Sequence, residues 1–417
     1  MNTQAKPTHD QRDWTFQPLS KEFTADPYAA YAELRRRDGF HYYPDFNVWI
    51  ASRYRDVQAL ALDRRMVRSL EGIASPEDLA ALQRSINFHD MPYHERFVQV
   101  NLLENDGEMH DRLRKHVFRY FTPAGVAGLR GMIQDYVDHL LDSVADREEI
   151  DFVADIASHV PGHIIGRLLG VPDEDCPKLR HWSEEIVRYF DIDRTDANKA
   201  IAENATKEFA DYMIALKADL ERNPGDNLMS KLLEIEREGG FVGDEYIATT
   251  MLILKAGHGS TIDVLGSGMH ALLRFPDQMK RLREDPSLVA TAVQEMFRYE
   301  SPLPFFHRYN AEDVEIDGKH FPKGTKFGLL YASANRDPEA FDDPDRFDAG
   351  RRPNRHIAFG GGAHFCLGNH LSRLDMEVIF TSLLERFSSI ELLEEPDYNS
   401  GIQARGPKSM KIALKPA

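Results

Sequence analysis

The sequence predicts a mostly α-helical protein with small β-sheets, and three observations support this fold class. Helical patterns follow one another through residues 125–240, with Pro/Gly breaks near residues 161, 171 and 224. A longer helical pattern runs from about residue 244 to 275. At roughly 1.5 Å per residue, such a helix would cross the core of a domain of this size. Strand patterns are few and short.

Length and composition limit the possible functions. The chain has 417 residues and a formal net charge of −17, which argues against general nucleic-acid binding. Its two cysteines favour a reducing, cytoplasmic setting and exclude a disulfide framework or a Cys-rich metal site. No apolar run has the length of a signal peptide or of a membrane span. We expect a flexible polar arm at 1–25 and one domain at 26–417, with a helix-rich lobe and a small β-rich lobe.

The elements outside the helical run are predicted from local signals. Asp26-Pro27 opens a helix, and Trp49-Ile50-Ala51 belongs to a short hairpin. Residues 70–105 show no clean period, so they form either a surface loop with a short helix or a substrate-facing lid. Short strands and turns follow at 314–324, and a hairpin turn is expected at Ser400-Gly401-Ile402.

A glycine-rich loop, Phe359–Gly368, surrounds Cys366 and leads directly into a helical pattern. Glycine allows backbone N–H groups to approach the sulfur closely, and the following helix N-terminus would also stabilise a thiolate. The loop therefore suits a metal ligand, a redox thiol or a nucleophile. Cys176 lies in a connection without a partner motif and is expected to be a plain thiol.

Two further stretches suggest a ligand. His110 and Arg114 share one helix face and could bind a dianion, although a solvated basic face is the simpler interpretation. The middle of the long helix contains Gly257 and Gly259, which each weaken a helix by about 1 kcal/mol relative to alanine. Leu252, Ala256 and Ser260 form a narrow stripe there. This pattern favours room for a flat ligand against the backbone.

These stretches resemble the cytochrome P-450 family, the haem-thiolate monooxygenases of the soluble bacterial type. The resemblance covers roughly residues 26–410 and implies the cytochrome P-450 fold, a triangular helical prism around a long central helix. It rests on four motifs in the family's order, namely His110-x-x-x-Arg114, Ala256-Gly257 with Ser260-Thr261, Glu295-x-x-Arg298 and the cysteine loop Phe359-Gly360-x-Gly362-x-His364-x-Cys366-x-Gly368.

The resemblance implies a role for each motif. Cys366 would be the axial thiolate of haem b, favouring O–O cleavage. Haem propionates would be held by His110, Arg114, Arg308 and His364. Haem contacts would also come from the residues Ala256, Gly257, Phe359, Gly360 and Gly368. The buried network that locks the cysteine loop would consist of Glu295, Arg298 and Arg346.

One position departs from the family pattern. Gly259 stands where many members have an acidic residue, and Ser260 stands where they have threonine. Two protons must still reach the distal side of the haem, so a donor or an ordered water is needed. We expect water held by Ser260, with Thr261 or His258 behind it, or a polar group of the substrate, to substitute.

Lys255 is a second unusual residue, because an amine near the pocket is costly to bury unpaired. In the simpler interpretation it pairs with an acid on an overlying helix, Glu184 or Glu185. In the other it faces the pocket and binds a carboxylate or phenolate of the substrate. The resemblance offers further substrate contacts, at Phe88, Leu252, Leu303, Phe305 and Ile402, and these suit a terpenoid, steroid or aromatic compound.

The expected reaction is insertion of one oxygen atom from O2 into a hydrophobic small molecule, by hydroxylation or O-dealkylation. No reductase domain is evident, so electrons would come from a separate ferredoxin and its reductase. Docking is expected on a basic face of Arg112, Lys115 and Arg119, with Arg351, Arg352 and Arg355 nearby. We expect a monomer without membrane or nucleic-acid partners.

Three alternatives stay open at this point. A peroxygenase or atypical oxidase using H2O2 is motivated by the acid missing at Gly259. A non-catalytic haem-binding module could use the same fold, although Cys366 and the propionate donors argue against it. Without the resemblance, a cysteine hydrolase would be considered, but no oriented base with a supporting acid is apparent near Cys366.

Overall fold

The computed structural model describes residues 14–190, 194–399 and 402–417. Its α-helices are α1 (Lys21–Ala25), α2 (Tyr28–Arg37), α3 (Tyr54–Leu62), α4 (Pro76–Ser85), α5 (Pro92–Phe97), α6 (Gly107–Phe118), α7 (Pro123–Ala127), α8 (Arg130–Val144), α9 (Val160–Leu169), α10 (Cys176–Arg188), α11 (Asp196–Arg222), α12 (Leu228–Arg237), α13 (Glu245–Arg274), α14 (Pro276–Glu284), α15 (Val289–Tyr299), α16 (Tyr331–Ala334) and α17 (Asn369–Arg386).

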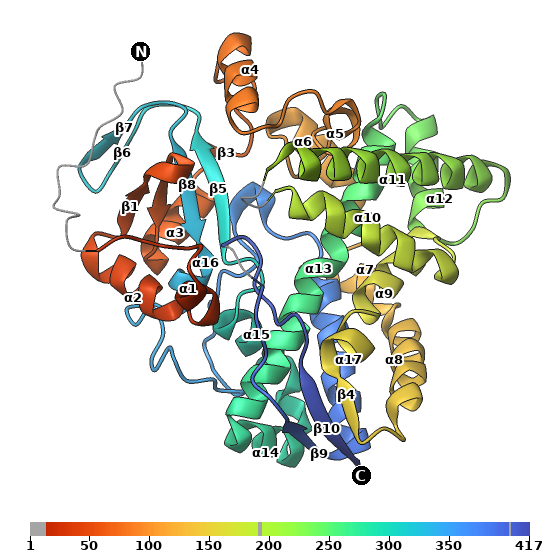
Figure 1. Cartoon of the computed structure of the whole chain (residues 1–417). Coiled ribbons are helices and arrows are strands. Elements are labelled where there is room, and N and C mark those ends of the chain that lie inside the picture. Colours follow the sequence, from red (N-terminus) through yellow and green to blue (C-terminus); the bar gives the residue numbers. More distant parts are fainter. Residues whose placement is uncertain (1–13, 191–193, 400–401) are drawn as a thin grey trace.

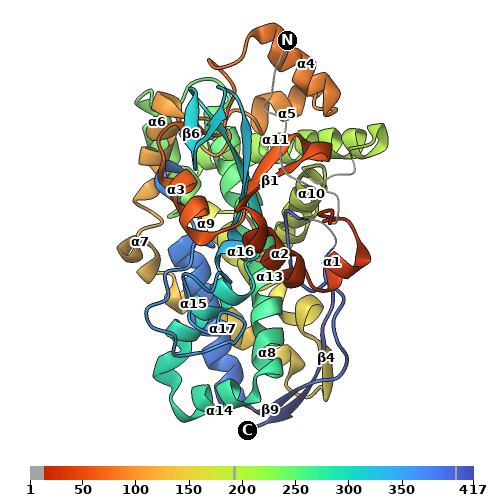
Figure 2. The ribbon, with the colours of Figure 1, turned by 90° about the vertical axis from the view of Figure 1, so that its left-hand side faces the viewer.

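The strands form small sheets beside this helical mass, as Figure 1 shows. They are β1 (Phe40–Tyr43), β2 (Val48–Ala51), β3 (Met66–Val67), β4 (Glu149–Asp151), β5 (Phe305–Asn310), β6 (Val314–Ile316), β7 (Lys319–Phe321), β8 (Lys326–Leu330), β9 (Phe387–Leu392) and β10 (Lys411–Pro416). The largest sheet has the order β1-β2-β8-β5-β3, and only its β2–β8 pair is parallel. In Figure 2 this sheet and helices α1 to α3 face the viewer. The mostly helical fold class is confirmed.

The N-terminal segment is more ordered than the sequence suggested. Residues 1–13 of the predicted arm lie outside the described residues, as do Ser400 and Gly401 of the predicted hairpin turn. From Trp14 onwards the chain packs on the β-rich side, where Phe16 and Phe23 are almost completely buried. The prediction of a loose arm is therefore wrong for residues 14–25, because aromatic side chains anchor this segment.

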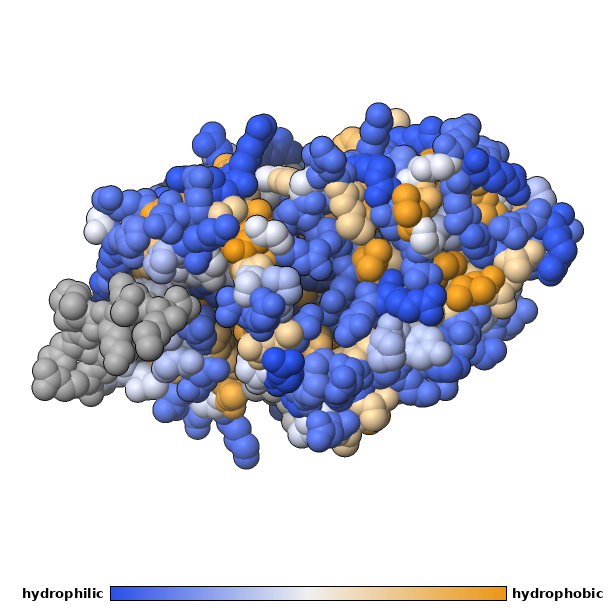
Figure 3. Space-filling model, turned by 90° about the horizontal axis from the view of Figure 1, so that it is seen from above, coloured by the Kyte–Doolittle hydropathy of each residue, from blue (hydrophilic) through white to orange (hydrophobic). Residues whose placement is uncertain are grey.

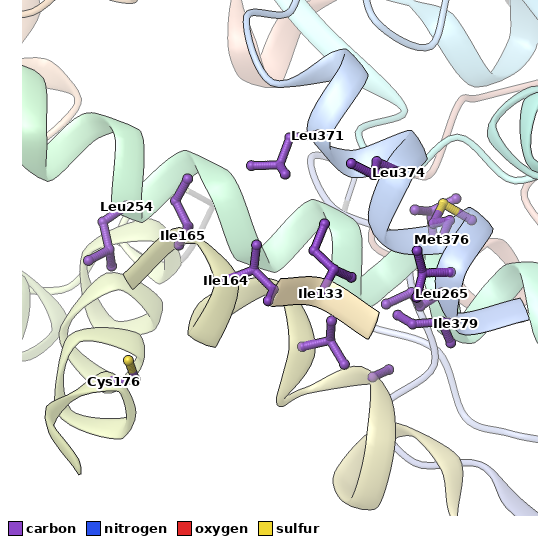
Figure 4. Close-up of a cluster of buried hydrophobic side chains, with 14 of the residues drawn as sticks. Ile133, Ile164, Ile165, Cys176, Leu254, Leu265, Leu371, Leu374, Met376 and Ile379 are labelled. Atoms are coloured by element: carbon purple, nitrogen blue, oxygen red, sulfur yellow. The ribbon is translucent and has the colours of Figure 1, made fainter. Parts of the chain in front are cut away.

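Helix α13 runs through the middle of the helical part and organises its core (Figures 1 and 2). Its apolar side chains join those of α8, α9 and α17 in the main hydrophobic cluster. Figure 4 shows how Ile164 and Ile165 of α9 and Leu371 of α17 converge on α13, which contributes Leu254 and Leu265. The positions of the site residues on α13 are thus fixed by packing on several sides.

Helix α13 begins after Asp244 without the side-chain cap that an aspartate at this position often provides. The Asp244 side chain makes no capping hydrogen bond and instead pairs with Arg96 at 2.9 Å. Glu245, in the first turn, accepts a hydrogen bond from the Val242 N–H at 2.8 Å and pairs with Arg112 at 2.6 Å. An acidic residue here is favourable because helix N-termini carry partial positive charge.

Within the described ranges, no helix is both long and apolar enough to span a membrane. On the face seen in Figure 3, hydrophobic residues form small separate groups within a mainly hydrophilic surface. The large apolar side chains that reach the surface include Leu62, Phe118 and Val242. Isolated apolar residues of this kind are normal on protein surfaces.

Candidate active site

The loop that carries Cys366 is shaped by close backbone approaches. Gly360 and Gly362 both have positive φ, and a Cβ on Gly362 would lie 2.5 Å from the Ala61 carbonyl oxygen. The Cys366 N–H donates to the Phe359 carbonyl at 2.9 Å, which closes the loop. Glycine is required at these two positions because a side chain would be strained or would clash.

The electrostatic surroundings of Cys366 act in opposite directions. Burial raises the pKa of its thiol, and hydrogen bonding from the backbone of Gly368, the charges of Arg114 and Arg373, and hydrogen bonding from the backbone of Asn369 lower it. The N–H groups and nearby cations therefore provide the expected support for a thiolate. Cys176 instead packs behind α9, and burial raises its pKa to about 11, so it is an inert thiol.

A buried ion-pair network lies next to this loop. Glu295 and Arg298 on α15 are fully buried and paired at 2.8 Å. The third member is Arg351, whose Nε lies 3.0 Å from Glu295. The prediction that Arg346 fills this role is wrong, because its side chain is half-exposed and pairs with Asp277. Arg346 contributes only its carbonyl, which accepts hydrogen bonds from Arg298 and Arg351.

The predicted dianion-binding residues come together around one buried space. The His110 and His364 rings lie 4.5 Å apart, and their Nε2 and Nδ1 atoms, respectively, are buried without a hydrogen bond to any residue that the structure describes. Arg308 is buried and donates to the carbonyl of the adjacent residue, His307, while burial lowers its pKa to about 10. Arg114 donates to the Phe365 carbonyl at 2.6 Å. Buried polar atoms without partners are rare, so this set of side chains suits an anionic ligand.

One face of α13 borders an internal space. Ala256 and Gly259 are exposed, and Lys255 and Ser260 are partly so, although the helix crosses the middle of the molecule. A Cβ on Gly259 would meet no atom of the described residues within 4 Å. Gly257 differs, because its Cβ would lie 3.0 Å from Ile165 of α9. Its lack of a side chain serves helix packing, so the expectation that both glycines make room for a ligand holds only for Gly259.

Two predicted catalytic residues point elsewhere. His258 is buried, and its Nδ1 lies 3.0 Å from the Leu254 carbonyl, on the side that packs towards Gly162 of α9. Thr261 is also buried, and its hydroxyl lies 3.0 Å from that of Ser372 on α17. The structure does not bring either residue to the open face with Ser260, so they are corrected to packing residues. The Thr261–Ser372 contact ties α13 to the helix that follows Cys366.

Asp263 is an acidic residue of α13 that none of the sequence motifs indicated. It lies four residues after Gly259 and seven after Ala256, and therefore on the same helix face. Among the described residues, Asn399 alone hydrogen-bonds to its carboxyl, at a long 3.4 Å to Oδ1, and burial raises the pKa of this carboxyl to about 7. The spacing from Gly259 is the signal that could have identified it.

Lys255 is not paired as the simpler interpretation expected. Glu184 pairs with Arg180 and Glu185 with Arg188, both within α10. Among the described residues, none forms an ion pair with Lys255, whose Nζ lies 4.9 Å from the centre of the Phe190 ring.

The other predicted substrate contacts are spread over several elements. Leu252 belongs to the open face of α13 but is almost fully buried. Phe88 packs against Tyr189 and Phe190. Phe305 and Ile402 belong to the apolar cluster on the β-rich side, and Leu303 is exposed.

The basic face is smaller than predicted. Arg112 is half-buried and forms an ion pair with Glu245, and Arg351 forms one with Glu295. Neither side chain is therefore available to a docking partner. Lys115 and Arg119 on and after α6 stay exposed, as do Arg352 and Arg355.

Comparisons with known proteins agree with this geometry. The family model "Cytochrome P450" matches residues 77–402. The chain is 33% identical over 410 residues to the polyketide biosynthesis cytochrome P450 PksS of Bacillus subtilis (strain 168), covering 96% of this chain and 98% of that protein. It is 34% identical to the vitamin D(3) 25-hydroxylase of Pseudonocardia autotrophica, covering 95% and 96%.

A solved structure is similar over nearly the whole length. The myxobacterial cytochrome P450 CYP267B1 in complex with myristic acid superposes with a TM-score of 0.88 at 35% identity, covering 95% of this chain and 98% of that one. Family members bind haem through a cysteine thiolate, and Cys366 is the cysteine at that position here. The chain therefore belongs to the cytochrome P450 family of haem-thiolate monooxygenases.

Proposed function

We propose that this enzyme oxidises a hydrophobic small molecule with electrons from a separate ferredoxin-type protein. The observation that carries the proposal is the open face of α13 at Ala256 and Gly259, together with the unpartnered ring nitrogens of His110 and of His364 in the Cys366 loop. When bound there, haem supplies the chemistry that activates O2 for insertion of one oxygen atom into the substrate.

The residues around this space fit haem. Cys366 would provide the thiolate, with Phe359 beside it and backbone N–H groups around the sulfur. Arg114 and Arg308 would donate to the propionates. His110 Nδ1 and His364 Nε2 each face a carboxylate, of Asp111 and Asp106 respectively, so their Nε2 and Nδ1 atoms would donate to the propionates when the rings carry both protons. These hydrogen bonds would be charge-assisted.

Ser260 would hold water on the open face of α13. No hydrogen bond to its hydroxyl is formed by any described residue, so it can both donate to and accept from a water molecule. Asp263 lies three residues further along α13 with its carboxyl against Gly406, and burial raises its pKa to about 7, so it would pass a proton to this water near neutral pH. Together they offer a proton route that replaces the acid missing at Gly259.

The substrate is expected to be mainly apolar. Relatives' names refer to polyketide biosynthesis and to vitamin D(3), and one similar structure contains myristic acid. Leu252, Phe88 and Phe190 supply apolar surface near the open face. We also infer a cytoplasmic setting, which the two free cysteines support.

The test has two stages. The haem-loaded enzyme should show the red-shifted Soret band of a thiolate-ligated ferrous carbonyl complex, and Cys366→Ser should not. Turnover of a hydrophobic substrate should then require NADPH, a ferredoxin reductase and a ferredoxin. Turnover with H2O2 but not with this electron chain would support the peroxygenase alternative.

A further inference from the structure

Lys255, in the first half of α13, is a charge for which the described residues supply no ion-pair partner. It is one residue before Ala256 and borders the internal space. Burial lowers the pKa of its amine to about 8. An ammonium without a carboxylate partner is costly in such a place, so a use for it is expected.

The groups around Lys255 do not neutralise it. The acid whose charge acts on it, Glu104, forms its ion pair with Arg68 at 2.8 Å. His94 is nearly fully buried, and burial followed by the Lys255 charge lowers its pKa to about 3, so it is uncharged at neutral pH. Phe190 offers only the face of its ring.

Positive charge also exceeds negative charge in the neighbouring interior. Lys326 of β8 forms no ion pair with any described residue, and its pKa is lowered to about 8, mainly by burial. The Arg68 charge lowers the pKa of both Lys326 and Lys255. Such an excess inside a chain with a net charge of −17 is suited to an anion from outside the protein.

We propose that Lys255 binds the carboxylate of a hydrophobic carboxylic acid, which is the substrate of this enzyme. The inference rests on the proposed function. One ammonium with a neutral His94 and an aromatic ring beside it matches a monoanion with an apolar body. The cations that act on Cys366 are Arg114 and Arg373, so the carboxylate site is separate from the thiolate.

The competing explanation is structural. In that case Lys255 stacks on Phe190 only to hold the end of α10 against α13, and no ligand contacts it. Lys217 provides a matched control, because its Nζ also lies 4.9 Å from an aromatic ring, that of Tyr246. Lys217 is paired with Glu236 at 2.7 Å and lies on α11.

Binding to the haem-loaded enzyme tests the proposal. The probes are decanoate with 1-decanol and 4-phenylbutyrate with 4-phenylbutan-1-ol, so each acid has a neutral analogue. We expect at least one acid to bind more tightly than its alcohol. Lys255→Met should weaken the binding of the acid by about tenfold or more and change the binding of the alcohol by less than about twofold. Lys255→Arg should retain part of the preference, and Lys217→Met should retain all of it.

Proton uptake gives a second readout that needs no variant. Because the amine is about half protonated at pH 8, binding of a carboxylate should draw up to about half a proton per site from the buffer. Calorimetry in buffers of different ionisation enthalpy measures this uptake. The alcohols should show none.

The proposal is overturned if neither acid is preferred over its alcohol, or if Lys255→Met weakens acid and alcohol equally. It is also overturned if acid binding takes up no protons at any pH between about 7 and 10, a range that covers the lowered and the ordinary pKa of the amine. A failure of the proposed function would look different, because the thiolate-ligated ferrous carbonyl spectrum would then be missing from the wild-type protein.

Discussion

Arg351 and Arg346 lie five residues apart, but only Arg351 reaches the buried Glu295. Removing one partner from a buried ion pair leaves an uncompensated charge, whereas an exposed pair contributes little. Arg351→Met should therefore lower the free energy of unfolding by about 3 kcal/mol. Arg346→Met should change it by less than about 1 kcal/mol. Denaturant titration of both variants checks this, and equal losses would contradict the assignment of Arg351.

Asp263 gives a pH dependence of stability whose sign follows from its raised pKa. Its ordinary value is 3.8 and its value in the folded protein is about 7, so the folded state binds the proton more tightly. The stabilisation is complete below about pH 4 and is lost as the pH rises through 7. Asparagine does not titrate, so the Asp263→Asn variant lacks this pH-dependent loss. Between pH 4 and 7, its free energy of unfolding should rise relative to that of the wild type by up to about 4 kcal/mol.

The comparison is made by measuring the free energy of unfolding of both proteins at several pH values. Subtraction removes other buried groups such as Asp375, whose pKa is also raised by burial. A difference that stays constant from pH 4 to 7 would show that the Asp263 carboxyl is already ionised at low pH.

At the scale of one helix, α13 uses its glycines in two ways. Gly257, Gly266 and Gly268 lie against Ile165, Pro407 and Met296, respectively. Gly259 faces open space. Gly259→Ala should stabilise the haem-free protein by about 1 kcal/mol, because alanine has the higher helix propensity. Gly257→Leu should destabilise it by about 1–3 kcal/mol through overpacking. Thermal unfolding of the haem-free variants distinguishes them.

The helices were predictable where the signal is local. The start of α2, the length of α13 and the glycine loop around Cys366 each follow from residues close together in the chain. The ion pairs of Glu184 and Glu185 were also predictable from local spacing. Arg180–Glu184 and Glu185–Arg188 are four and three residues apart, which allows each pair to form within α10.

Tertiary partners were not predictable in this way. Arg112 meets Glu245 across 133 positions, and nothing near either residue indicates the pair. The choice of Arg351 over Arg346 likewise depends on the path of an irregular segment. His258 and Thr261 adjoin the open face in sequence, but the helix turns each by about 100° per residue, which directs them to α9 and α17.

At the scale of the whole molecule, charge is unevenly placed for electron transfer. The chain carries −17 overall, yet Lys115 and Arg119 stay exposed beside Phe118. If an acidic ferredoxin docks here, Lys115→Glu should slow reduction at low ionic strength and weaken its salt dependence. Stopped-flow reduction at several salt concentrations measures both.

Lys408→Glu is the control. It makes the same change in charge at an exposed residue near the C-terminus, outside the proposed docking face. Arg112→Glu is a poor test, because it would break the ion pair that fixes the start of α13. Unchanged rates in Lys115→Glu would exclude this docking face.

The parallel pairing of β2 with β8 has a consequence for biosynthesis. Trp49 is aligned with Phe327, so β2 finds this neighbour only after about 330 residues have been translated. Until then the apolar strand Val48–Ala51 has only the short β1 hairpin beside it. Unpaired apolar strand edges promote aggregation of nascent chains. A ribosomal pause before codon 326 should therefore lower the soluble yield more than a pause near codon 400, when β8 has left the ribosome.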